Sequence, residues 1–324
     1  MESRCLGQTG LRVSVVGLGC NNFGGMVAGL DEAAAKDVIH AALDTGITLF
    51  DSADSYGTDG GSERVLGRAL QGRRHEVVLA TKFASPLGGS GRRGYDGSRR
   101  HILRAVEDSL RRLGTDHIDL YQYHFPDPDT PIEETLRALE DLVRSGKVRY
   151  IGCSNLPAWQ LVEAHWVARY NRIGGFAATQ AEYNLLDRTA EETLLPALRA
   201  TGLSLLPYFP LASGLLTGKY RASRLPSEGR LIDLPYFKDG LSAERLARIE
   251  ALATFAEDRG RTLLELAFAW LLSEPQVASV MAGATRPEQV KANARAAGWR
   301  LDSETRVAID RLLADPAAAG RTTT

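Results

Sequence analysis

Two residues that could perform acid–base chemistry follow a short apolar stretch near residue 50. The stretch 47–50 predicts a buried strand that stops at Asp51, and Tyr56 follows in a turn of small polar residues. A carboxylate at the end of a strand and a phenol in the next loop suit an acid–base site at the mouth of a βα barrel. An aspartate in this position is more often a turn residue or a helix cap. Asp51 and Tyr56 therefore indicate an acid–base site only if residues from other strands lie beside them.

Such partners follow the other predicted strands. Lys82 follows the strand near 77–80, and His124 follows the strand near 117–122. Taken alone, the lysine could be a solvated strand end and the histidine a satisfied group under a loop. Because the carboxyl ends of barrel strands share one rim, we expect Asp51, Tyr56, Lys82 and His124 to meet there.

These four residue types form a coherent apparatus for protonating a carbonyl oxygen. A free phenol has a pKa of about 10. A lysine cation about 4 Å away contributes roughly 4 kcal/mol at an effective dielectric constant of about 20. We therefore expect Lys82 to lower the pKa of Tyr56 by up to about three units, towards neutrality. Asp51 can hold the lysine charge by ion pairing, and His124 can donate a hydrogen bond to the substrate or tune the phenol.

Carbonyl protonation requires a nucleophile for the carbon atom, and side chains do not supply hydride. A nicotinamide cofactor is the expected source. The sequence contains no Ser–His–Asp arrangement and no metal-binding constellation that would suggest other chemistry. Residues that follow the later strands could hold the cofactor: Ser154, Asn155 and Gln180 at its amide, Tyr208 on its ring, and 211–219 and 283–286 at its phosphates. A plain turn or helix cap is the alternative at each position.

The pattern of elements predicts an α/β fold, a (β/α)8 TIM barrel with an N-terminal β-hairpin and extra C-terminal helices. Strands are expected near 15–19, 47–50, 77–80, 117–122, 148–152, 178–181, 203–206 and 278–281. Helices are expected near 32–44, 61–71, 98–113, 131–145, 157–169, 190–200, 241–258, 262–272, 286–298 and 302–314. An open doubly wound sheet is the competing architecture, but Asn22 stands where its glycine fingerprint needs a third glycine.

Composition limits the class of protein. The chain has 324 residues, 44% apolar and 24% charged, with a net charge of -1. This balance argues against a nucleic-acid partner, and no apolar run is long enough to span a membrane. Three scattered cysteines and the absence of a secretory signal predict a cytoplasmic protein. We expect one domain over 1–324, with a hairpin over 1–13, the barrel over 14–300, and a C-terminal helix and tail over 301–324.

Taken together, these motifs resemble those of the aldo-keto reductases. The most specific are Asp51-Ser-Ala-Asp-Ser-Tyr56-Gly, Ala80-Thr-Lys82 and the block from Arg112 to His124. Within this family, the sequence is most similar to a bacterial branch that also resembles potassium-channel β subunits. The resemblance implies NADPH-dependent reduction of aldehydes or ketones, with Asp51, Tyr56, Lys82 and His124 catalytic and Tyr56 as the proton donor.

The resemblance also implies a set of cofactor contacts around the barrel mouth. These are Gly19, Cys20, Asn21, Asp51, Ser154, Asn155, Gln180, Tyr208, Phe209, Pro210, Leu211, Ser213, Gly214, Leu215, Lys219, Gly283, Thr285, Arg286, Gln289 and Asn293. Arg286 beside Thr285 is expected to bind a 2′-phosphate, which favours NADP over NAD. Phe209 stands where many relatives have serine, Ala282 replaces a frequent proline, and Asn21-Asn22 adds polar groups near the expected nicotinamide.

Two other functions stay open. The β-subunit resemblance allows a cofactor-binding, redox-sensing subunit that turns over slowly and forms an oligomer, and the same site could oxidise an alcohol or sugar. The substrate is expected to contact the loops 21–29, 85–97, 125–129 and 221–240. The four tryptophans fall on predicted helices, where a packing role is expected: Trp159, Trp166, Trp270 and Trp299.

Overall fold

The computed structural model describes residues 1–25, 30–86, 95–221, 225–227, 230–233 and 241–314. Parts of the predicted loops 21–29, 85–97 and 221–240, and the predicted tail after Ala314, lie outside these residues. Within them, no helix has the length and apolar character that crossing a membrane requires.

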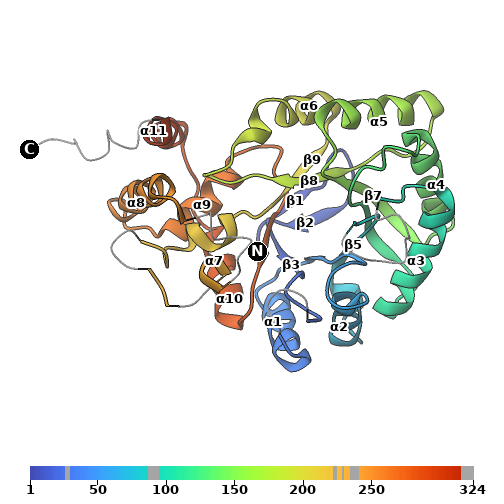
Figure 1. Cartoon of the computed structure of the whole chain (residues 1–324), viewed down its shortest axis with the longest axis horizontal. Coiled ribbons are helices and arrows are strands. Elements are labelled where there is room, and N and C mark those ends of the chain that lie inside the picture. The colour runs from blue at the N-terminus through green and yellow to red at the C-terminus, as the bar shows by residue number, and fades with distance from the viewer. Residues whose placement is uncertain (26–29, 87–94, 222–224, 228–229, 234–240, 315–324) are drawn as a thin grey trace, which may run out of the picture.

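Eight parallel strands form a closed barrel (Figure 1). They are β3 (Val16–Gly19), β4 (Leu49–Asp51), β5 (Val78–Phe83), β6 (Ile118–Tyr123), β7 (Val148–Ser154), β8 (Ala178–Glu182), β9 (Ser204–Tyr208) and β10 (Val280–Gly283). Each strand pairs with the next, and β10 returns to β3 with Gly283 opposite Gly19. A parallel bridge from Leu205 to Val277 connects β9 to the segment before β10 and completes the ring. The predicted barrel is confirmed, and the doubly wound alternative is wrong.

A small hairpin closes the amino end of the barrel. Strands β1 (Ser3–Cys5) and β2 (Arg12–Ser14) pair antiparallel. Leu6 and Val13 are fully buried in a cluster with residues that point into the barrel, such as Leu49 and Leu120. This plug leaves the opposite, carboxyl end of the barrel for chemistry.

A ring of helices covers the outside of the barrel (Figure 1). It contains α1 (Glu32–Asp44), α2 (Gly61–Ala69), α3 (Arg99–Leu113), α4 (Ile132–Arg144), α5 (Ala158–Asn171), α6 (Leu194–Thr201), α9 (Leu263–Leu272) and α10 (Pro287–Ala296). The additional helices are α7 (Arg230–Asp233), α8 (Ala243–Glu257) and α11 (Ser303–Ala314), with short 3-10 turns η1 (Arg74–Glu76), η2 (Thr189–Glu191) and η3 (Ala212–Thr217). The side chain of Asp31 caps α1, accepting a hydrogen bond from the Ala34 backbone amide at 2.8 Å.

One helix prediction needs correction. The helix expected over 190–200 starts only at Leu194, because Pro196 is compatible with a first turn but not with a helix interior.

The packing role expected for all four tryptophans is also wrong in part. Trp270 is buried and Trp299 packs on the core just beyond the end of α10, but Trp159 and Trp166 are 68% and 62% exposed.

Candidate active site

Side chains from β4, β5 and the β4–α2 loop meet at the carboxyl end of the barrel. The Lys82 Nζ donates hydrogen bonds to Asp51 Oδ2 at 2.5 Å and to the Ser52 backbone carbonyl at 3.0 Å. It lies 3.4 Å from the Tyr56 hydroxyl oxygen and 4.8 Å from the centre of that ring. Lys82 is only 1% exposed, so its charge is held against one carboxylate and away from water. Three of the four predicted catalytic residues are therefore in contact.

Two buried glutamines complete the surroundings of the carboxylate. Gln122 Nε2 and Gln180 Nε2 each donate to Asp51 Oδ1 at 2.8 Å, and Gln180 also donates to Gln122 Oε1 at 3.0 Å. Gln122 is not among the residues predicted from the sequence. The available signal was a polar residue inside the apolar strand β6, since a buried amide needs a partner. The two amides fix the orientation of Asp51 and leave its other oxygen to Lys82.

The expected lowering of the Tyr56 pKa is wrong. Burial raises the pKa of the Tyr56 phenol above its usual value, and this effect outweighs the attraction of Lys82 for the phenolate. Burial by itself would lower the pKa of Lys82, but Asp51, together with Tyr56, raises it above its usual value. The site therefore holds a neutral phenol beside a charged ammonium group at neutral pH, which is the protonation state that a general acid needs.

His124 is the fourth predicted residue, and it stands beside the phenol. Its ring lies edge-on to the Tyr56 ring with the centroids 5.8 Å apart. Burial, with a smaller effect of the Lys82 charge, lowers the pKa of His124 well below its usual value. Its Nδ1 is buried and has no hydrogen-bond partner among the described residues. The imidazole is therefore neutral and has one N–H to donate.

Two further buried carboxyl groups, Asp54 in the β4–α2 loop and Glu63 on α2, are not among the predicted residues. Glu63 is fully buried and accepts hydrogen bonds from Thr81 Oγ1 at 2.5 Å and Arg112 Nε at 2.6 Å. Burial, with the nearby charge of Glu63, raises the pKa of Asp54 to about 8. The Oδ1 of Asp54 has no hydrogen-bond partner among the described residues. Sequence spacing alone does not reveal the surroundings of Glu63, because its partners come from β5 and α3.

The residues predicted to hold a cofactor amide form one hydrogen-bonded cluster. The Asn155 amide donates to Ser154 Oγ at 3.1 Å and to the His124 carbonyl at 3.0 Å. The Tyr208 hydroxyl donates to Asn155 Oδ1 at 2.9 Å. Asn155 has a φ of 59°, a left-handed conformation that asparagine adopts more readily than most residues. The cluster connects β7 and β9 directly to the backbone of His124.

The segment after β9 has an unusual backbone and a cation at its end. Positive φ angles occur at Phe209, Ala212, Ser213, Gly214 and Gly218. Such turns can direct successive backbone N–H groups towards an anion. A Cβ atom on Gly214 would lie 3.4 Å from Lys219 Cε and 3.7 Å from its Nζ, so the lysine lies against the glycine. Among the described residues, no carboxylate forms an ion pair with Lys219.

The end of β10 brings the last predicted contacts to the same rim. Gly283 and Gly19 are paired, and a Cβ atom on Gly283 would lie 3.1 Å from the Asn22 amide nitrogen. Gln289 Oε1 accepts from the Thr285 backbone amide at 2.7 Å and from its hydroxyl at 3.1 Å. Arg286 precedes α10 and is exposed, and Asn293 is buried on that helix. The predicted phosphate and adenosine contacts thus lie along one side of the barrel mouth.

A comparison with known proteins decides the family. The model of the aldo/keto reductase family matches residues 15–314. The chain belongs to this family. It is 38% identical to aldo-keto reductase YhdN of Bacillus subtilis, covering 97% of this chain and 94% of the relative. It is also 37% identical to a probable voltage-gated potassium channel subunit beta of Oryza sativa subsp. japonica (91% of each chain) and 34% identical to L-glyceraldehyde 3-phosphate reductase of Escherichia coli K12 (97% and 93%).

Membership supports an oxidoreductase that acts on the carbonyl groups of small molecules, in a family whose members generally use NAD(P)H. The resemblance read from the sequence, including its branch towards channel β subunits, is therefore confirmed.

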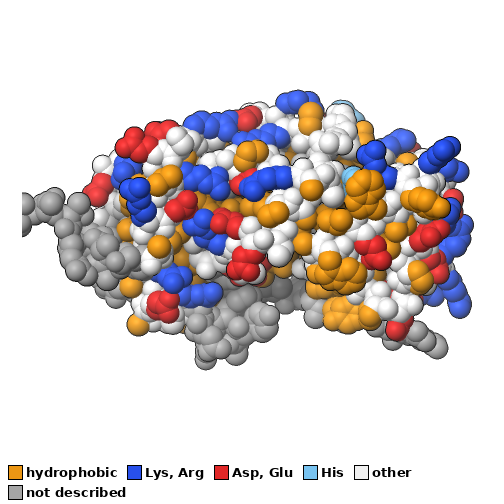
Figure 2. All heavy atoms as spheres, turned by 90° about the horizontal axis from the view of Figure 1, so that it is seen from above, with side chains coloured by type: hydrophobic (Ala, Val, Ile, Leu, Met, Phe, Trp, Pro, Cys, Tyr) orange, Lys and Arg blue, Asp and Glu red, His pale blue; other side chains and the backbone are white. Residues whose placement is uncertain are grey.

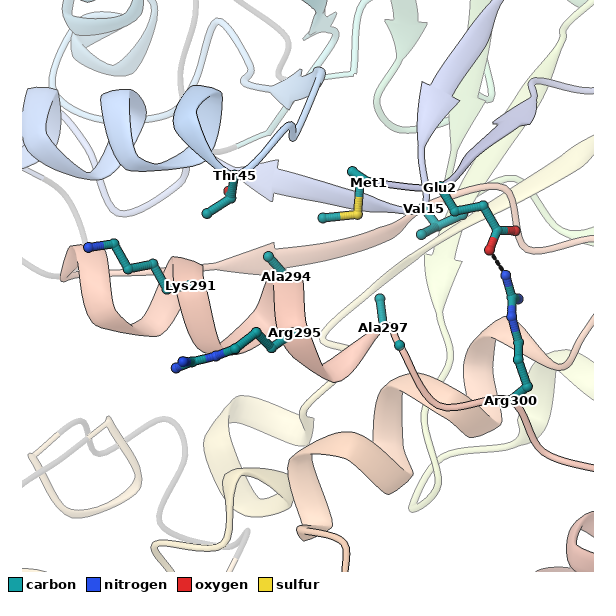
Figure 3. Close-up of a pocket in the computed structure, with 10 residues that line it drawn as sticks. Met1, Glu2, Val15, Thr45, Lys291, Ala294, Arg295, Ala297 and Arg300 are labelled. Atoms are coloured by element: carbon teal, nitrogen blue, oxygen red, sulfur yellow. Dashed lines mark ion pairs between the residues drawn. The ribbon is translucent and has the colours of Figure 1, made fainter.

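This aldo/keto reductase also has a hollow at the opposite end of the barrel (Figure 3). Its volume is about 580 Å³, and it lies between Met1, the end of α1 and the second half of α10. Val15, just before β3, forms part of its wall, whereas Asp51, Tyr56, Lys82 and His124 lie at or beyond the carboxyl ends of the strands. None of the predicted site residues lines this hollow, so the strand ends remain the candidate active site.

Proposed function

We propose that this protein reduces an aldehyde or ketone to an alcohol with NADPH, and that Tyr56 is the proton donor. The observation that carries the proposal is the Tyr56 hydroxyl 3.4 Å from a buried Lys82 ammonium that is paired with Asp51. A neutral phenol, a fixed cation and a neutral imidazole at one rim suit the reduction of a carbonyl group. They bind a carbonyl oxygen and supply it with a proton.

Each side chain has a distinct role in this proposal. Nicotinamide, when bound, supplies the hydride. Tyr56 donates its proton to the carbonyl oxygen, and Lys82 stabilises the negative charge that develops on the phenol oxygen. Asp51 keeps Lys82 charged and in place. His124 donates a hydrogen bond to the substrate oxygen and so orients the carbonyl group for attack.

The residues along the rim fit a dinucleotide. The cluster of Ser154 and Asn155 offers amide and hydroxyl groups to a carboxamide, and the half-buried Tyr208 offers a ring for stacking. Lys219, beside the glycine turn, offers a cation to the pyrophosphate. We propose that Arg286, which is exposed and has no ion pair with a described residue, binds the 2′-phosphate and makes NADPH the preferred cofactor.

The decisive experiment compares Tyr56→Phe with wild type and with Tyr170→Phe, a matched loss of a hydroxyl on the outer face of α5. NADPH oxidation is followed with a panel of aldehydes and ketones, and NADPH binding is followed by fluorescence. We expect Tyr56→Phe to lose reduction by at least about a hundredfold with cofactor affinity nearly unchanged. Tyr170→Phe should behave as wild type. Full activity in Tyr56→Phe would remove the proposed proton donor.

The potassium channel subunits among the relatives favour one second candidate, a redox-sensing subunit with tight cofactor binding and slow turnover. Single-turnover hydride transfer separates the two, because a sensor would transfer one hydride at a rate far below that of a metabolic enzyme. The oxidative direction, as an alcohol or sugar dehydrogenase, is tested with the same protein and NADP+. We further propose that the chain acts as one domain in the cytoplasm.

A further inference from the structure

Helix α5 exposes a stripe of aromatic side chains, here called the α5 stripe: Trp159, Trp166 and Tyr170. They are 68%, 62% and 90% exposed. Spacings of seven and four residues place them on one side of the helix. Seven large hydrophobic side chains are exposed among the described residues, and three of them belong to this stripe. In Figure 2, hydrophobic side chains gather on the face that α5 helps to form.

The barrel does not need this stripe. Helix α5 packs on the barrel through its other side, with Leu161, Ala164 and Ala168 buried. A helix with one surface on the core normally carries polar groups on the opposite surface. Apolar side chains on both sides indicate that α5 is covered twice, once by the barrel and once by something outside this chain.

The neighbouring helix α4 provides an internal comparison. It occupies the same layer, but its outer surface carries ion pairs one turn apart, Arg137 with Glu133 at 2.8 Å and Arg144 with Glu140 at 3.0 Å. The same position in the ring is therefore compatible with a charged, soluble surface. The aromatic surface of α5 is a property of this helix and not of the fold.

The charges around the stripe indicate what covers it. Glu163 lies in the first half of α5, and Arg169 lies in the second half, where its guanidinium is 5.9 Å from the Trp166 ring centre. Glu163 and Arg169 are both exposed, and neither has an ion pair with a described residue. An antiparallel copy of the same helix would bring the basic half of one to the acidic half of the other. The surface is thus complementary to itself.

We propose that the α5 stripe is the centre of a homodimer in which two copies pack α5 antiparallel about a two-fold axis near Trp166. Glu163 of each copy then faces the half of the partner helix that carries Arg169 and the Tyr170 hydroxyl. Symmetric dimers of this kind are the commonest soluble oligomers. With roughly 200 Å² for each aromatic side chain, the stripe contributes about 400 Å², or half of the roughly 800 Å² that each partner buries in a standard interface. Side chains next to the stripe supply the remainder.

The test measures the mass of the full chain in solution by sedimentation over a range of micromolar concentrations. Wild type should dimerise, and Trp166→Glu should raise the dissociation constant at least about thirtyfold, as expected for an aromatic residue at the centre of an interface. Val307→Glu is the matched control, because Val307 is a 46% exposed apolar residue on α11, and it should leave the dimer intact. Tryptophan emission should shift to shorter wavelength as the wild-type dimer forms.

Three results would overturn the proposal. One is a wild-type chain that stays monomeric up to about 100 μM. Another is an oligomer that Trp166→Glu does not weaken, which would place the interface elsewhere. The third is a monomer whose α5 stripe is protected only when a different protein is added. Circular dichroism of each variant confirms that the barrel is folded, and Glu163→Arg, which replaces an exposed residue, provides a second variant expected to weaken the dimer.

Discussion

Replacing Lys82 by methionine isolates the effect of the buried charge on the proposed proton transfer. The Lys82 Nζ is 3.4 Å from the Tyr56 oxygen. At an effective dielectric constant of about 20, a full negative charge at that distance would be stabilised by about 5 kcal/mol. This corresponds to roughly three and a half powers of ten in rate. Because the proton is only partly transferred in the transition state, we expect Lys82→Met to lower the rate of reduction by about 100- to 1,000-fold.

The same substitution leaves a buried carboxylate without its cation, so a loss of stability could be mistaken for a loss of catalysis. Breaking a buried ion pair costs about 3–5 kcal/mol. The double variant Asp51→Asn/Lys82→Met removes both charges, while the amide oxygen of asparagine can still accept from Gln122 and Gln180. We expect the double variant to recover most of the stability and none of the rate.

The assay is single-turnover oxidation of bound NADPH by a reactive aldehyde, with unfolding followed separately by urea denaturation. NADPH affinity should change little in Lys82→Met, since Lys82 is not among the expected cofactor contacts. A double variant that reduces the aldehyde within tenfold of the wild-type rate would refute the reasoning, because the cation would then be dispensable for proton transfer.

Three further predictions concern the cofactor and the buried carboxyl group. Arg286→Ala should weaken NADPH binding by at least about tenfold and NADH binding hardly at all, as measured by fluorescence titration; equal losses would dismiss the 2′-phosphate contact. Gly214→Ala should weaken NADPH more than Gly218→Ala, because both glycines have positive φ but only Gly214 lies against a lysine side chain; equal effects would show that backbone strain alone is responsible. The pKa of Asp54 is raised from 3.8 to about 8, so the folded state holds this proton to higher pH than the unfolded chain and loses stability as pH rises through that window. Asp54→Asn should therefore raise the urea midpoint more at pH 8 than at pH 5, and a gain that is the same at both pH values would contradict the assignment.

The sequence predicts best the positions of those site residues that the strand ends fix directly. Asp51, Lys82 and His124 come at or just after strand ends, and strand ends in a parallel barrel share one rim, so a one-dimensional pattern locates them. Gln122 pairs in register with Lys82 one residue before the end of β6, but an uncharged amide at that position gives no signal beyond its need for a partner. The pKa of Tyr56 depends on how deeply the phenol is buried, which only the packed structure reveals.

The tryptophans show a different limit. Helical periodicity predicts that Trp159 and Trp166 lie on α5, but not which side of the helix faces the barrel. Leu161, Ala164 and Ala168 take that side because smaller residues fit the closer approach between α5 and the sheet. Large apolar residues are usually expected in the core, and this expectation fails where a surface has a second partner.

The reversed shift of the Tyr56 pKa makes the proposed mechanism more consistent. A phenol with a pKa near neutrality would already have lost much of its proton before the substrate arrived, and only the protonated fraction could act as an acid. Burial keeps the proton on Tyr56, and the buried Lys82 gains its full effect only as negative charge appears on the oxygen. The ion pair with Asp51, held by amides from β6 and β8, keeps that cation in position beforehand. The arrangement therefore favours the transition state over the resting phenol, which is the condition for catalysis.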